Sequence, residues 1–130
     1  MTDAREEGLR IFKEMLPGRL PEGDVRLTDG KIGGELGELS LTNVFGTLWS
    51  RPGLSRRDRS LVTLGILIAL RAEGELREHF AIGRTNGLTD DEIAEVLYHA
   101  TGYAGFPAAA AARKIAVQVL SPAEGADGSA

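Results

Sequence analysis

The chain has 130 residues, of which 42% are hydrophobic and 26% are charged, and its formal net charge at pH 7 is −4. This length fits one domain and is too short for two independent cores, and the composition excludes disorder throughout. The acidic balance opposes binding to nucleic acid, and the absence of cysteine excludes disulfides, thiolate nucleophiles and cysteine-bound metals. We therefore expect one globular domain that does not bind nucleic acid.

The N-terminus and the apolar runs carry no targeting or membrane signal. Residues 1–7 lack the basic start and apolar stretch of a signal peptide. The longest apolar run, residues 64–70, is much shorter than the roughly 20 residues needed to span a bilayer. We expect a cytoplasmic protein that does not contact the membrane.

Two helices are predicted in the first half of the chain. Apolar residues at helical spacing predict a helix from Asp3 to Met15, which Pro17 and Gly18 end. The glycine-rich residues 18–34 have no sustained period and predict a loop with at most a short turn. A second helix ends in residues 49–53, and its apolar residues at i, i+3, i+4 and i+7 are Leu41, Val44, Phe45 and Leu48.

Four helices are predicted in the second half. A capping box of Ser55 and Asp58 opens a helix over residues 56–72, which is apolar nearly all round from Leu61 to Leu70 and so suits burial on several sides or a subunit contact. The next helix covers residues 73–86 and ends at a left-handed cap formed by Asn86-Gly87. A second capping box, Thr89 with Glu92, opens the fifth helix, and residues 106–120 form an alanine-rich sixth. Residues 121–130 are predicted to be a disordered tail.

His79 is the first candidate for chemistry. It lies in the middle of a predicted helix, and Glu75 lies one turn earlier on the same face, where its carboxylate could orient the imidazole. Such a pair can transfer protons. The alternative is an ordinary surface histidine beside helix charges.

Tyr98, His99 and Tyr103 form a second candidate cluster near the end of the fifth predicted helix. They could line a pocket wall, or they could be aromatic residues of the core. A metal site that combines His79 with His99 and nearby acids is not supported by any HxxxH or HExxH spacing.

Two arginines flank a Pro-Gly turn ahead of the apolar helix. Arg51 and Arg59 could each pair with a substrate carboxylate, or they could hold structural acids. Ser60 has no nearby histidine and no GxSxG context, so a serine hydrolase is not supported.

An ordered series of segments closely resembles the 4-carboxymuconolactone decarboxylases. The segments are Trp49-Ser50-Arg51-Pro52-Gly53-Leu54, Arg59-Ser60-Leu61-Val62-Thr63, Leu76-Arg77-Glu78-His79, Asn86-Gly87 and Tyr103-Ala104-Gly105-Phe106-Pro107-Ala108. The resemblance covers residues 5–120. It implies an all-α, single-domain bundle of about six helices over residues 1–120, with the alkyl hydroperoxidase D-like fold, that assembles into a homohexameric ring.

The thiol enzymes of this superfamily place a CxxC pair ahead of a histidine that matches His79. Ala72 and Glu75 stand at the two cysteine positions of this chain, so a peroxidase cycle through a disulfide is chemically impossible. The resemblance therefore implies the decarboxylase branch. Its reaction is cofactor-independent decarboxylation of a carboxylated γ-lactone in the degradation of aromatic compounds.

The departing carbon dioxide leaves an electron pair that delocalises into the lactone carbonyl, so the substrate is its own electron sink. The enzyme must supply a cation for the carboxylate, a donor for the developing oxyanion and a general acid. The resemblance implies His79 as general acid or oxyanion donor, with Glu75 orienting it and with no metal or cofactor. The implied substrate contacts are Arg51, Arg59, Trp49, Tyr98, His99 and Tyr103.

The sequence departs from the family pattern at pocket positions. The family commonly has Glu at Thr47, Arg at Ala81, and Ser or Asn at Ala109 and Ala110, so the pocket is predicted to be less polar. Arg84, one turn after Ala81, is the candidate replacement for the missing arginine. Two alternatives therefore stay open: a related cofactor-free isomerase or cyclase acting on a less charged substrate in secondary metabolism, and a non-catalytic oligomeric binding protein.

Overall fold

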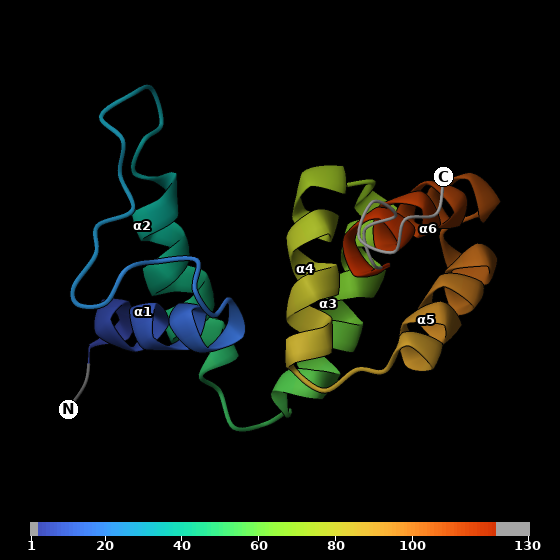
Figure 1. Ribbon diagram of the computed structural model, residues 1–130, viewed down its shortest axis with the longest axis horizontal. Coiled ribbons are helices and arrows are strands. Elements are labelled where there is room, and N and C mark those ends of the chain that lie inside the picture. Colours follow the sequence, from blue (N-terminus) through green and yellow to red (C-terminus); the bar gives the residue numbers. More distant parts are fainter. Residues whose placement is uncertain (1–2, 122–130) are drawn as a thin grey trace, which may run out of the picture. The chain divides into compact units, whose positions relative to one another are not determined.

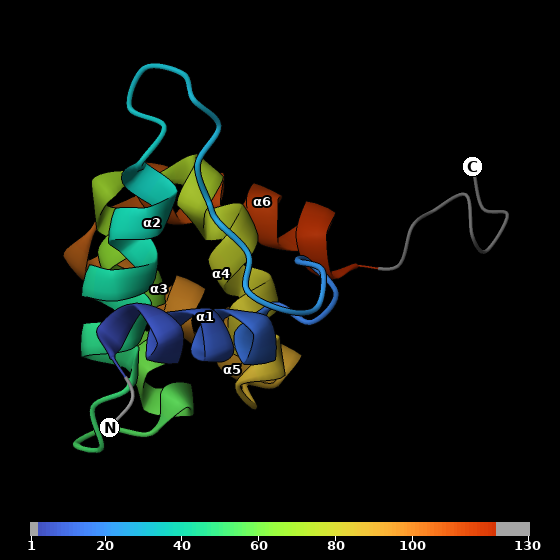
Figure 2. The ribbon, with the colours of Figure 1, turned by 90° about the vertical axis from the view of Figure 1, so that its left-hand side faces the viewer.

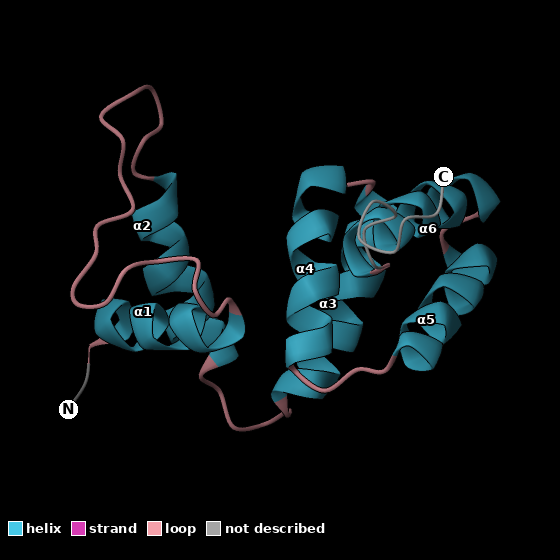
Figure 3. Ribbon diagram, viewed as in Figure 1, coloured by secondary structure: helices cyan, strands magenta, loops and turns pink. Residues whose placement is uncertain are grey.

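The computed structural model describes residues 3–121, which divide into two compact units between Arg56 and Arg57. The described residues form six α-helices and one π-helix and contain no strand, so the all-α prediction is confirmed (Figures 1 and 3). None of these helices is long and apolar enough to cross a membrane. Residues 122–130, which are most of the predicted tail, lie outside the described residues.

The N-terminal unit begins with α1, Ala4–Met15, as the spacing predicts. The Asp3 side chain caps the helix by accepting a hydrogen bond from the Glu6 amide at 2.7 Å. Its buried face includes Gly8, whose missing side chain lets α1 cross the next helical segment in direct backbone contact.

The second predicted helix differs from its prediction in length and in type. It consists of α2, Leu36–Ser40, continued without a break by the π-helix η1, Leu41–Trp49. Of the four apolar residues at α-helical spacing, Leu41 and Phe45 are buried, whereas Val44 and Leu48 are 39% and 48% exposed. A π-helix bonds residue i to i+5, and this wider turn moves Val44 and Leu48 out of the buried face and brings Trp49 into it.

Charged side chains hold the loop of residues 16–35, which Figure 2 shows running from the end of α1 back to α2, and Arg5 makes the most contacts among them. Arg5 forms a bidentate pair with Glu38 at 2.8 and 3.0 Å, binds Asp24 at 2.5 Å, and donates to the Val25 carbonyl. Glu38 also accepts a hydrogen bond from the Leu27 amide at 2.6 Å. The loop prediction is confirmed, and this cluster of charges fixes the path of the loop.

The C-terminal unit contains α3, Arg56–Leu70; α4, Glu73–Thr85; α5, Asp90–Tyr103; and α6, Phe106–Leu120. A left-handed residue, Arg71 at φ 55°, turns the chain between α3 and α4, and Gly87 at φ 105° ends α4 as predicted. The predicted capping box of Thr89 and Glu92 is present, with both of its hydrogen bonds.

Both α4 and α5 pack against α6, and a single apolar core joins the four helices. The fully or nearly fully buried core side chains include Leu64, Ile68, Leu76, Phe80, Leu88, Ile93, Ala112 and Ile115. Burying each large side chain contributes about 1.5–3 kcal/mol, so this core is sufficient to fix the positions of the four helices.

The apolar helix α3 buries only one face within the C-terminal unit. Leu64 and Ile68 are fully buried, whereas Val62, Ile66 and Leu70 are 54%, 53% and 70% exposed. Within the C-terminal unit, α3 is therefore not buried on several sides. The exposed face remains available for another surface to cover.

Candidate functional site

His79 lies in the middle of α4, where the apolar face of the helix fixes it in place. Its neighbours Leu76 and Phe80 are buried in the core. The His79 ring is partly buried and its Nδ1 atom is shielded from solvent, whereas Glu75, one turn earlier, is exposed. His79 is therefore not the ordinary solvent-exposed histidine of the alternative prediction, because its ring is partly covered by neighbouring residues.

Burial and two carboxylates act on His79 in opposite directions. Loss of solvent around the ring lowers the pKa of His79 below its ordinary value of 6.5, and the negative charges of Glu75 and Glu78 partly oppose this by favouring the imidazolium. Burial has the larger effect, so His79 is neutral at pH 7. A neutral imidazole can donate an N–H to a developing negative charge without being a charged group itself.

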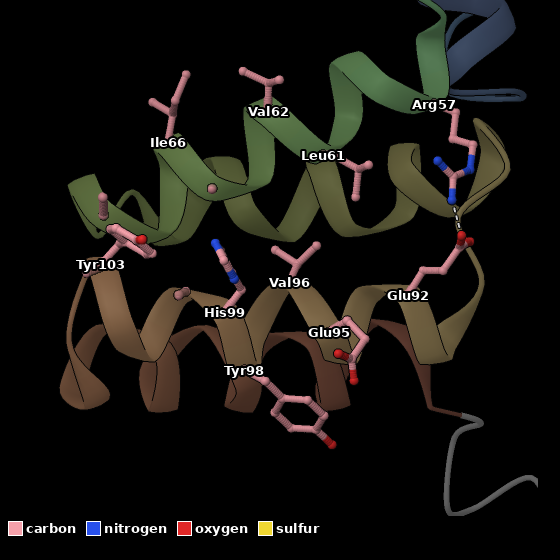
Figure 4. Close-up of a pocket in the computed structure, with 14 residues that line it drawn as sticks. Arg57, Leu61, Val62, Ile66, Glu92, Glu95, Val96, Tyr98, His99 and Tyr103 are labelled. Carbon is pink, nitrogen blue, oxygen red and sulfur yellow. Dashed lines mark hydrogen bonds and ion pairs between the residues drawn. The ribbon is translucent and has the colours of Figure 1, made fainter.

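The second predicted cluster lies on α5, beside a groove of about 1130 Å³ between α3 and α5 (Figure 4). The His99 and Tyr103 rings stack with their centroids 5.2 Å apart and tilted by 31°. His99 and Val96 point toward α3, and Leu61 on α3 points back toward them (Figure 4). Tyr98 is also part of the groove lining, but its ring points away from α3.

The charges along this α3–α5 groove are mostly negative. An ion pair joins Arg57 on α3 to Glu92 on α5 at one end of the groove (Figure 4). Glu95 adds a second carboxylate, and Arg57 is the only cationic side chain among the described residues that line the groove. Such a groove is poorly suited to a substrate with one or two carboxylates, because its single guanidinium is already paired.

The structure brings together only part of the predicted site. Tyr98, His99 and Tyr103 share the α3–α5 groove, but His79, Glu75 and Arg59 do not line it. Arg59 lies on α3 with its Nε atom buried.

The two remaining predicted residues belong to the N-terminal unit. Trp49 is the buried last residue of η1, and the exposed Arg51 follows it after one residue. The predicted site residues therefore lie in three places: the α3–α5 groove, the positions of Glu75, His79 and Arg59 elsewhere on α3 and α4, and the end of η1 in the N-terminal unit.

Sequence reasoning missed the pairing of Arg57 with Glu92. The two residues are 35 positions apart, and Glu92 was interpreted only as the second member of a capping box. The sequence indicates only that Arg57 lies near the start of one helix and Glu92 near the start of another, and this does not predict that the two side chains are in contact.

The positions that depart from the family pattern also lie in different places. Thr47 donates its hydroxyl to the Thr42 carbonyl at 2.7 Å within η1, and Ala81 is half-buried on α4. Ala109 and Ala110 instead line a second groove, between α5 and α6. Among residues 3–121, no three His, Asp or Glu side chains are grouped so that they could hold a metal ion.

These features define an all-helical protein that contains no cysteine and carries on α4 a partly buried histidine with a lowered pKa. Residues 35–118 match the model of the carboxymuconolactone decarboxylase family. The chain belongs to this family.

Two named relatives are similar to the chain. A 4-carboxymuconolactone decarboxylase of Acinetobacter baylyi is 49% identical over 76 residues, which cover 58% of this chain and 57% of that protein. A nitrosuccinic acid decarboxylase of Metarhizium robertsii is 39% identical over 103 residues, or 78% of this chain and 71% of that protein. The chain therefore matches little more than half the length of the bacterial relative.

Proposed function

We propose that the protein is a lyase that removes carbon dioxide from a small carboxylic acid without a cofactor, and that 4-carboxymuconolactone or a close analogue is its substrate. The observation that carries this proposal is its similarity to two proteins named as decarboxylases of different acids. The two acids share one chemical property: each carries its own electron sink. In a carboxylated butenolide the lactone carbonyl accepts the electron pair, and in nitrosuccinic acid the nitro group accepts it.

Because an acid of this kind carries its own electron sink, its decarboxylation needs few groups from the protein. The C–C bond to the carboxylate breaks, carbon dioxide leaves, and the electron pair moves onto the carbonyl or nitro oxygen of the substrate. The protein must stabilise that oxygen and return one proton to carbon. No step requires a thiol, which this chain lacks.

We assign the stabilisation of that oxygen to His79. Because burial keeps its imidazole neutral, an N–H of His79 can be aimed at the developing oxyanion in a partly desolvated setting, where hydrogen bonds to charge are strongest. Between the two roles considered for this residue, burial favours oxyanion donor over general acid, since the lowered pKa leaves little imidazolium at pH 7. Glu75 is the proposed positioning residue, because its charge acts on the ring from one turn away.

This assignment predicts a pH dependence. The neutral form of His79 predominates at neutral and alkaline pH and is lost as the pH falls through the lowered pKa of the folded protein. The rate of decarboxylation should therefore be level at neutral and alkaline pH and should fall as the solution becomes acidic. A pH–rate profile in which activity rises as the pH falls below 6.5 would assign the reaction to an imidazolium acid instead.

The substrate carboxylates require cations. We propose Arg51 and Arg59, which the resemblance to the family implies, as the carboxylate contacts, with Tyr103 and Trp49 as less direct contacts of the substrate. We also propose that Tyr98 and His99 on α5 contact the substrate.

The chain is also proposed to associate with copies of itself into a ring of six. The support for this is the exposed apolar face of α3, with Val62, Ile66 and Leu70, which a second surface would remove from water. Light scattering of the purified protein at micromolar concentration tests this proposal. A monomer under these conditions would contradict it.

The activity is tested by incubating the protein with 4-carboxymuconolactone and, separately, with nitrosuccinate, and by trapping the carbon dioxide released. Release from either acid with formation of the protonated product supports a decarboxylase, and the faster acid identifies the electron sink. Turnover without carbon dioxide would select a cofactor-free isomerase or cyclase. Binding without any turnover would select a non-catalytic binding protein.

A further inference from the structure

A second groove lies between α5 and α6, and Tyr98 is the one proposed substrate contact among its described lining residues. Its volume is about 350 Å³, near the lower end of the range typical of small-molecule sites. The groove contains no histidine among its described lining residues, and His79 is not part of it. It is therefore distinct from the position assigned to the proposed reaction.

Alanine side chains form the middle of this α5–α6 groove, and aromatic side chains flank it. Ala94 on α5 and Ala109 and Ala110 on α6 all line the groove, and their short side chains occupy little of its space. Tyr98 and Phe106 stand at the sides and are 63% and 72% exposed. The Tyr98 ring, which points away from α3 in Figure 4, is thus available to this second groove.

One cation marks the groove. Arg113 on α6 is exposed and is the only Lys or Arg among the described residues that line it. The one carboxylate there, Asp90 at the start of α5, is already paired with Arg84 at 2.5 Å. Among the described residues that line the groove, no unpaired carboxylate is therefore present to bind Arg113, and its planar guanidinium matches a ligand carboxylate in two hydrogen bonds.

We propose that the α5–α6 groove binds a small aromatic carboxylate. Arg113 holds the carboxylate, the ring lies over Ala109 and Ala110, and Tyr98 and Phe106 contact the ring face or edge. Aromatic pairs of this kind add to the apolar area that is removed from water, and the small volume limits the ligand to one or two rings.

The test uses 2-naphthoate as the probe, titrated into the full chain by calorimetry and by NMR of ¹⁵N-labelled protein. Binding is expected to shift the amides of α5 and α6 in this groove. The neutral analogue 2-naphthamide should bind on the order of tenfold or more weakly, because it loses the charge-assisted contact to Arg113.

Two variants and a matched control complete the test. Arg113→Gln should weaken 2-naphthoate by at least about tenfold, and Ala110→Leu should block binding by filling the groove. Lys114→Gln removes the same charge from the adjacent residue, which lines a different groove between α4 and α6, and should leave the affinity unchanged. Circular dichroism confirms that each variant is folded.

Three results would overturn the proposal. The first is the absence of binding to the wild-type chain at millimolar 2-naphthoate, which is also the result if a second copy of the chain covers this groove. The second is equal affinity of the wild type and Arg113→Gln. The third is a set of shifted amides that lies outside α5 and α6. None of these results depends on decarboxylation, so they leave the proposed function untouched.

Discussion

The crossing of α1 and η1 depends on two glycines, and replacing Gly8 by alanine tests this contact. A methyl group at Gly8 would lie 1.8 Å from the Leu41 carbonyl oxygen and 2.9 Å from the Gly46 amide nitrogen. Ordinary contact begins near 3.4 Å, so the helices must separate by about 1.6 Å. Both obstacles are backbone atoms, which cannot rotate away.

The expected loss of stability lies at the upper end of overpacking effects, about 3 kcal/mol. For a chain of this length that corresponds to a fall in melting temperature of roughly 10 °C. Thermal unfolding followed by the fluorescence of Trp49 measures it, because the only tryptophan of the chain is buried in the N-terminal unit.

A matched control makes the same change where there is room. Gly65 lies inside α3, and a methyl group there would meet nothing within 4 Å. Gly65→Ala should therefore stabilise the chain by about 0.5–1 kcal/mol through helix propensity. The reasoning fails if Gly8→Ala melts within one or two degrees of the wild type, or if both variants lose the same stability.

Three further substitutions test local contacts. Glu38→Gln should speed hydrogen exchange of the Leu27 amide, because the Glu38 carboxylate accepts the hydrogen bond of that amide. Hydrogen bonds from the Arg5 guanidinium and the Leu27 amide lower the pKa of Glu38 to about 2. The stabilisation from Glu38 is therefore present above about pH 4.5 and is lost as the pH falls toward 2. Thr89→Ala removes the N-cap of α5 and should cost about 1 kcal/mol in chemical denaturation, whereas unchanged stability would contradict the capping role. Ser60→Ala leaves the Asn86 amide without its 3.0 Å acceptor and should cost about 1 kcal/mol or more, which a denaturation midpoint equal to that of the wild type would refute.

Helix ends were predictable from the sequence because their signals are local. Thr89 and Glu92 are three residues apart and form the capping box that this spacing indicates. Gly87 adopts the positive φ that ends α4. Each of these features depends on neighbouring residues alone, so no knowledge of the packing is needed.

The π-helix and the exposed face of α3 were not predictable in the same way. An apolar pattern at Leu41 and Phe45 fits an α-helix and a π-helix equally well, and only Val44 and Leu48 reveal the difference once burial is known. The apolar run of α3 indicated that more than one face of the helix is apolar, but it could not show that the C-terminal unit covers only the face of Leu64 and Ile68.

The candidate site divides in the same manner. The i, i+4 spacing correctly placed Glu75 and His79 on one helix and His99 beside Tyr103. Spacing could not show that the His79 ring is partly buried and neutral, because that depends on the packing around α4. It also could not show that the groove beside His99 carries a paired arginine and an excess of carboxylates.

The most direct test of the account is the turnover number of His79→Gln compared with that of His99→Gln, with the acid that the wild type decarboxylates faster. Both substitutions remove an imidazole, but the His79 ring is partly buried and its pKa is lowered, whereas the His99 side chain is exposed. We predict that His79→Gln keeps its melting temperature and its oligomeric state and loses about 10²-fold or more in kcat, with His99→Gln close to wild type. Nearly full turnover by a folded His79→Gln, with the loss appearing in His99→Gln instead, would contradict the assignment and move the reaction to the α3–α5 groove.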